Sequence, residues 1–104
     1  MPTKKKREKQ VEERIVKRAR EHGGIAFKFT SPGRRSVPDR FMLMPCWDDG
    51  DQFIEAKAPG EKPTPSQLRE HERIRRRGGT VYVIDDYEPC DDLFEMLCNG
   101  SCLL

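Results

Sequence analysis

Long apolar runs are missing from this chain of 104 residues, in which 35% of the residues are hydrophobic and 37% are charged. No segment approaches the roughly 20 apolar residues that a membrane-spanning helix needs. The basic start is not followed by the apolar core of a signal peptide. We therefore expect a cytoplasmic protein, and the length fits one domain with a modest core.

Cysteine pairs with the spacing of a metal site are also missing. The four cysteines are Cys46, Cys90, Cys98 and Cys102, and no CxxC pair occurs among them. Without an export signal we expect free thiols rather than disulfides. Cys98 and Cys102 have the i,i+4 spacing of one helix face, so a structural zinc site is a weaker alternative.

Charge is present in both signs but is unevenly distributed. Residues 1–40 hold 13 Lys and Arg against 5 Asp and Glu, whereas residues 41–104 hold 7 against 13, which gives +8 and −6. A basic first half is typical of a phosphate-binding surface. The run of Lys and Arg over residues 4–7 is equally typical of a solvated arm. The acidic stretch after Asp85 should face away from nucleic acid or meet a protein partner.

The hydrophobic pattern predicts an alternation of helices and strands. Val11, Ile15 and Ala19 recur at helical spacing, and Gly23 supplies a stop. Thr64 followed by Pro65 and Gln67 is a helix start with a capping box. We expect helices over residues 7–22, 65–77 and 91–97, and strands over residues 25–29, 41–44, 52–58 and 80–84.

The order of these elements predicts an α/β fold, with a small mixed sheet flanked by helices in an αβββαβ core. The second and third strands should form a hairpin, the second helix should pack along an edge of the sheet, and the fully apolar fourth strand should be interior. We expect a flexible arm over residues 1–7, one domain over residues 8–98 and a frayed end over residues 99–104.

Two carboxylates and a lysine stand out near the middle of the chain. Glu55 and Lys57 lie two apart in a predicted strand, so their side chains share one face, and Asp39 can supply a second carboxylate. Carboxylate oxygens suit Mg²⁺ or Mn²⁺, and a neighbouring lysine can orient a water. On residue types alone, an edge strand with a solvent face and a turn residue after Pro38 explains the same pattern.

The chain resembles the VRR-NUC domain, the virus-type replication-repair branch of the PD-(D/E)XK nucleases, over roughly residues 8–86. The order and flanks of the matching segments carry the resemblance. They are Gly23-Gly24, Lys28, residues 31–33, residues 37–40, residues 54–60, Pro65 to Gln67 with His71, and residues 81–85. Ser36 stands where the family commonly has a second glycine in the loop before the aspartate, which puts the shape of that loop in question.

The resemblance implies a restriction-endonuclease-like fold and a site that binds Mg²⁺ or Mn²⁺. Asp39, Glu55 and the backbone carbonyl of Ala56 would be the ligands, and Lys57 would position or activate water. A glutamate of the first helix completes the family's site, for which Glu12 is preferred over Glu8, while Glu13 points away. Gln67 would contact the site or the DNA, although capping alone explains it.

The resemblance also implies DNA as the substrate. Lys28, Arg34, Arg35 and Arg40 are the expected phosphate contacts, and His71 is either a polar contact to substrate or a structural histidine. Stand-alone members resemble dimeric Holliday-junction resolvases, so we expect a homodimer acting on branched DNA in a phage, prophage or bacterial setting. The alternatives are a flap or general nuclease, a DNA-binding module that does not cut, and a small interaction protein.

Overall fold

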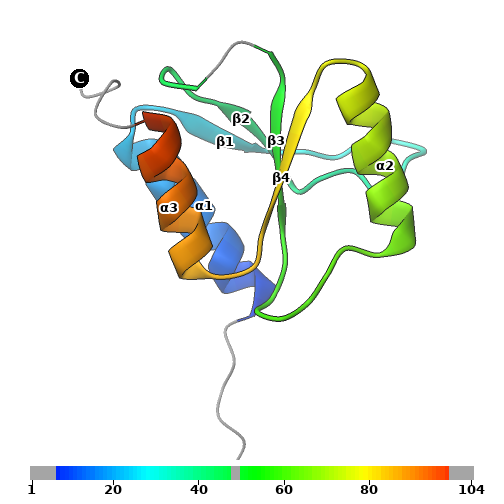
Figure 1. Ribbon diagram of the computed structural model, residues 1–104, viewed down its shortest axis with the longest axis horizontal. Coiled ribbons are helices and arrows are strands. Elements are labelled where there is room, and N and C mark those ends of the chain that lie inside the picture. The colour runs from blue at the N-terminus through cyan, green and yellow to red at the C-terminus, as the bar shows by residue number, and fades with distance from the viewer. Residues whose placement is uncertain (1–6, 48–49, 99–104) are drawn as a thin grey trace, which may run out of the picture.

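The computed structural model describes residues 7–47 and 50–98, so the predicted arm and frayed end lie almost entirely outside the described residues. Three helices and four strands follow each other in the order α-β-β-β-α-β-α (Figure 1). Their bounds are α1 Glu8–Glu21, β1 Ile25–Lys28, β2 Arg40–Leu43, β3 Gln52–Ala56, α2 Pro65–Arg76, β4 Thr80–Ile84 and α3 Tyr87–Cys98.

The four strands form one mixed sheet in the order β1-β2-β3-β4. β1 pairs with β2 and β2 with β3 in antiparallel fashion, and β3 pairs with β4 in parallel. The predicted α/β class, mixed sheet and hairpin are therefore confirmed. The prediction that β4 is interior is wrong, because β4 is the last strand in the sheet as described. Ile84 of β4 lies in the main core with Phe94 of α3 and Val81 is buried on the opposite face, but Val83 is 37% exposed.

The two faces of the sheet carry different residues because side chains alternate along each strand. Ile54 and Ala56 of β3 are fully buried in a core with Val11 and Ile15 of α1 and Phe94 of α3. Glu55 points to the opposite face, where it contacts α2. One strand thus supplies both the main core and a polar contact with α2.

Two helices start toward the end of the sheet at which β3 ends. The start of α1, the carboxyl end of β3 and the start of α2 all lie at the lower end of the view in Figure 1. The predicted capping box fixes the start of α2. Gln67 N–H donates to the Thr64 hydroxyl over 3.1 Å, and the Gln67 side chain accepts from Thr64 N–H over 2.8 Å.

α3 begins at Tyr87, four residues before the predicted start at Asp91. Pro89 discourages a helix in the sequence, but it is the third residue of α3, where the backbone N–H has no partner within the helix to lose. Asp91 of this helix binds Arg14 and Arg18 of α1, with its two closest contacts at 2.6 and 2.8 Å. The hydrogen bonds from Arg14 and Arg18 lower the pKa of Asp91. Part of the acidic stretch is therefore used to join α3 to the basic helix α1.

The expectation of four free thiols is wrong for two of them. Cys46 and Cys98 form a disulfide, with their Cα atoms 5.1 Å apart, although 52 positions separate them in the sequence. The fold brings the segment after β2 next to the end of α3, which the sequence alone does not indicate. Cys90 is a free, buried thiol, and burial raises its pKa to about 12. Cys102 lies outside the described residues.

Across residues 7–47 and 50–98, no helix combines the length and the apolar character needed to cross a membrane.

Candidate active site

The strand register places Asp39 opposite Glu55. In the antiparallel β2–β3 ladder, Phe41 pairs with Phe53 and Arg40 pairs with Ile54. One residue further along, the same register sets Asp39 opposite Glu55. Asp39 is fixed there because its Oδ2 atom accepts a 2.7 Å hydrogen bond from the Ala56 N–H. The two carboxylates predicted from the sequence therefore meet at the end of the hairpin.

Glu55 is held from the other side by α2. Gln67 Nε2 donates to Glu55 Oε2 over 3.1 Å, and His71 Nε2 lies 3.2 Å from Glu55 Oε1. Glu55 is 1% exposed and His71 is fully buried. Burial, followed by the charge of Arg75, lowers the pKa of His71. Both predicted α2 residues thus contact Glu55, and Gln67 also caps its helix.

The site carries an excess of negative charge in a buried setting. Burial raises the pKa of Glu55 to about 8, and the nearby Asp39 carboxylate adds to the rise. Burial likewise raises the pKa of Asp39. Two like charges this close cost free energy unless a proton or a cation compensates them. The buried Lys57, on the same face as Glu55, supplies part of that compensation.

The two candidate glutamates of α1 have different surroundings. Glu12 accepts a 2.7 Å hydrogen bond from Arg40 Nε and lies 3.7 Å from Lys28 Nζ. Glu8, one turn earlier, interacts electrostatically with Asp39 and Lys57; burial and then the Asp39 charge raise its pKa. The preferred residue Glu12 is thus bound to two basic side chains, and both Glu12 and Glu8 interact electrostatically with Asp39.

The four expected phosphate contacts have different surroundings. Arg40 is bound to Glu12 and to the Ala26 carbonyl, which its Nη1 reaches over 3.1 Å. Lys28 and Arg35 are exposed. Arg34 is exposed as well, yet its Nη1 binds the buried Glu70 of α2 over 3.1 Å. Sequence reasoning missed Glu70; its only signal was its position beside His71 on the same helix.

Ser36 has a local role in the loop where the family commonly has glycine. Its hydroxyl lies 2.5 Å from the hydroxyl of Ser66, near the start of α2. Gly33, earlier in the same loop, has a φ of +79°, which favours glycine. The serine therefore ties the loop to the start of α2.

The donor set of this site suits a magnesium-like ion. No group of three His, Cys, Asp or Glu side chains placed to hold a metal occurs among the residues that the structure describes. Mg²⁺ sites commonly use only one or two carboxylates, with waters and substrate phosphate oxygens as the other ligands. Asp39 and Glu55, whose like charges lie close together, match that pattern. Ala56, whose carbonyl oxygen is a further candidate ligand, directly follows Glu55 in β3.

No family model matches the chain, but comparison with known proteins finds similar sequences and structures. A protein of Acyrthosiphon pisum secondary endosymbiont phage 1, named "Putative nuclease p44", is 51% identical over 82 residues, which cover 79% of this chain and 86% of that protein. A solved structure described as "VRR_NUC domain" is 36% identical with a TM-score of 0.75 and covers 85% of this chain and 94% of that one.

Proposed function

Because this chain belongs to the VRR-NUC family of nucleases, we propose that it is a metal-dependent endonuclease that hydrolyses phosphodiester bonds in DNA. The observation that carries the proposal is the pair of carboxylates, Asp39 and Glu55, which face each other at the sheet end beside a buried lysine. Two close carboxylates whose charge Lys57 compensates only in part are costly, and such a cost is typical of a site that binds a cation.

The residues at the site have different roles in this proposal. Asp39, Glu55 and the Ala56 carbonyl would hold Mg²⁺ or Mn²⁺, which when bound supplies Lewis-acid stabilisation of charge on the phosphoryl group. Lys57 would orient the attacking water and offset developing negative charge. His71 and Gln67 hold the Glu55 carboxylate in place, so we assign them positioning roles.

We assign the contribution of α1 to Glu8 at least as much as to Glu12. Glu12 is bound to Arg40 and Lys28 and also interacts electrostatically with Asp39. Glu8 interacts electrostatically with Asp39, Lys57 and Glu55, and it forms no ion pair with the residues that the structure describes. In this proposal Glu8 would hold a water of the metal, and Glu12 would orient Arg40. Comparing the cleavage rates of Glu8→Gln and Glu12→Gln separates the two roles. An equal loss of cleavage rate in both variants would contradict the assignment of different roles to Glu8 and Glu12.

The substrate we propose is branched DNA in the cytoplasm of a bacterial or phage-infected cell. We expect purified protein to cut a four-way junction in the presence of Mg²⁺ or Mn²⁺ and to lose this activity in EDTA. Cleavage of the junction should exceed cleavage of a flap and of a linear duplex of equal length. Faster cleavage of the flap would favour a flap nuclease, and binding without cleavage of any DNA would favour a non-catalytic module.

We also propose that the protein acts as a two-fold homodimer, because paired sites match the symmetry of a junction. Ile25, Phe27 and Leu43 are 46–57% exposed on β1 and β2, and Ile25 and Leu43 are direct cross-strand partners. An apolar patch on a sheet face can be buried by the same patch of a second copy. Phe27→Asp should convert a particle of twice 12.1 kDa into a monomer in sedimentation analysis; a monomeric wild type would contradict the proposal.

A further inference from the structure

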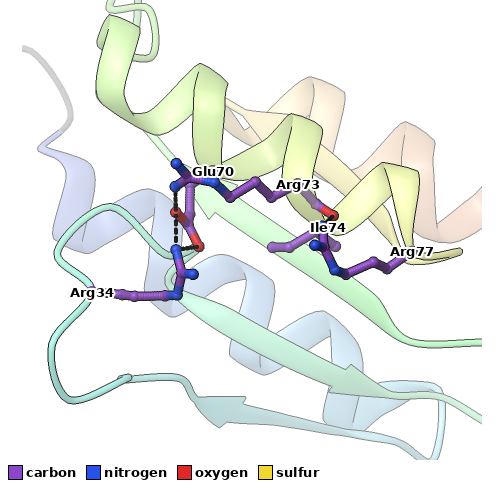
Figure 2. Close-up of a pocket in the computed structure, with 5 residues that line it drawn as sticks. All are labelled: Arg34, Glu70, Arg73, Ile74 and Arg77. Carbon is purple, nitrogen blue, oxygen red and sulfur yellow. Dashed lines mark hydrogen bonds and ion pairs between the residues drawn. The ribbon is translucent and has the colours of Figure 1, made fainter.

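A basic pocket lies between the loop after β1 and the outer side of α2. Its volume is about 290 Å³, and Figure 2 shows Arg34 reaching across from the loop toward Glu70, with Arg73 alongside. Ile74 supplies an apolar wall, and Arg77 closes the pocket toward the end of the helix. The pocket thus collects three guanidinium groups from two separate segments.

Glu70 holds two of these guanidinium groups in fixed positions. Its side chain is 9% exposed and lies 3.1 Å from Arg34 Nη1 and 2.8 Å from Arg73 Nη1. Arg77 Nη1 is fixed separately, because it donates to the Arg73 carbonyl over 3.0 Å. Guanidinium groups that are already oriented lose less conformational freedom when they bind a ligand.

The positive charge of the pocket exceeds the negative charge that its own residues supply. Three arginines face one carboxylate, which leaves a formal charge of +2. Arg34 and Arg73 each use Nη1 on Glu70, so the Nε–H and Nη2 groups remain as donors on each side chain. A phosphate group accepts such paired N–H donors and supplies the missing negative charge.

The pocket and the candidate active site are linked through one helix. Glu70 and His71 are neighbours on α2, and Glu70 binds Arg34 while His71 contacts Glu55. The capping box and the Ser36–Ser66 contact fix the start of the same helix. A group bound in the pocket would therefore be held at a constant separation from the Asp39–Glu55 pair.

We propose that this pocket binds a phosphate of the DNA other than the one that is cleaved, and so sets where the strand lies relative to the active site. The proposal rests on the proposed function, since it takes DNA as the ligand. It assigns the phosphate contact to Arg34 of the loop, to Arg73 of α2 and to Arg77, which directly follows α2. The competing explanation is that these arginines only join the loop to α2.

Binding of a 20-base-pair fluorescent duplex in EDTA tests the proposal without requiring cleavage. The double variant Arg73→Gln/Arg77→Gln should raise Kd about tenfold and reduce the slope of log K against log salt by about 0.9, the value for one lost phosphate contact. The matched control is Arg69→Gln/Arg76→Gln, on exposed positions of the same helix with the same change in charge. We expect it to change Kd by no more than about twofold and to keep the slope.

Equal effects of the two double variants would overturn the proposal, because general attraction to the basic helix would then explain binding. The melting temperature of each variant reports whether the fold is kept. Duplexes with and without 5′-terminal phosphates separate the sources of the ligand. If the Arg73→Gln/Arg77→Gln variant loses the same affinity for both duplexes, the pocket binds an internal phosphate. If it loses affinity only for the phosphorylated duplex, the pocket binds the phosphate at a strand end. A protein that shows this selective loss but cuts no DNA would disprove the nuclease function and leave the pocket assigned.

Discussion

Replacing Lys57 by Met should lower kcat for metal-dependent DNA cleavage about 100- to 1,000-fold, as expected when one preorganised electrostatic contact to a transition state is removed. Lys57 follows β3, where its N–H donates to the Ile84 carbonyl over 2.8 Å, so the β3–β4 ladder holds its backbone. Its side chain is 9% exposed and faces the carboxylate pair. Methionine keeps much of the length of the side chain and removes only the charge.

The measurement is single-turnover cleavage with DNA binding measured in parallel. Kd should change little, because a buried lysine at the sheet end makes few contacts to the rest of a duplex. Lys62→Met, in the exposed loop before α2, is the matched control and should cleave at the wild-type rate. Wild-type cleavage by the Lys57 variant, in a preparation shown to contain no contaminating nuclease, would mean that the lysine takes no part in the chemistry.

Local rules account for part of the candidate site, and the resemblance to the VRR-NUC domain supplied the choice of Asp39, Glu55 and Lys57 as one site. Alternation along one strand places Glu55 and Lys57 together, and the hairpin register then sets Asp39 opposite Glu55. The capping box of α2 was equally local, since Thr64 and Gln67 lie three positions apart. Residues whose spacing follows from one element or one turn can therefore be placed without knowing how the helices pack.

Other features depend on packing between distant elements, and the sequence could not provide them. Whether Glu8 or Glu12 faces the site depends on the rotation of α1 against the sheet, and Arg40 is bound to Glu12 only because α1 crosses beneath β2. The ion pair of Arg34 with Glu70 joins positions 36 apart. The Cys46–Cys98 disulfide likewise requires the end of α3 to return to the segment after β2.

The second large effect concerns the metal-free protein, in which the carboxylate pair should reduce stability. Burial and the Asp39 charge raise the pKa of Glu55 from 4.5 to about 8, so the folded state holds a proton that the unfolded state releases. A raised carboxyl pKa means that stability falls as pH rises from about 4.5 through 8. At pH 8 in EDTA, Glu55→Gln should therefore be more stable than wild type by about 1–3 kcal/mol, a rise in Tm of several degrees.

The glutamine can keep the contacts of the glutamate. Its carbonyl oxygen can accept from Gln67 or His71, and its amide can donate to Asp39, so the variant removes charge while leaving the local packing in place. The matched control is Glu72→Gln on the exposed side of α2, which should leave Tm unchanged within about one degree.

Addition of Mg²⁺ or Mn²⁺ should reverse the order of the two proteins. A cation that binds only the folded state stabilises it in proportion to the logarithm of its concentration over Kd. Wild type should therefore gain stability with added metal, while Glu55→Gln, which lacks one of the two carboxylates, should gain little. Calorimetric scans of wild type and of Glu55→Gln at pH 8, with and without about 10 mM metal, measure the Tm of each protein in both conditions. If the Tm of wild type did not respond to either cation, Asp39 and Glu55 would not form a metal site, and their proximity would need another explanation.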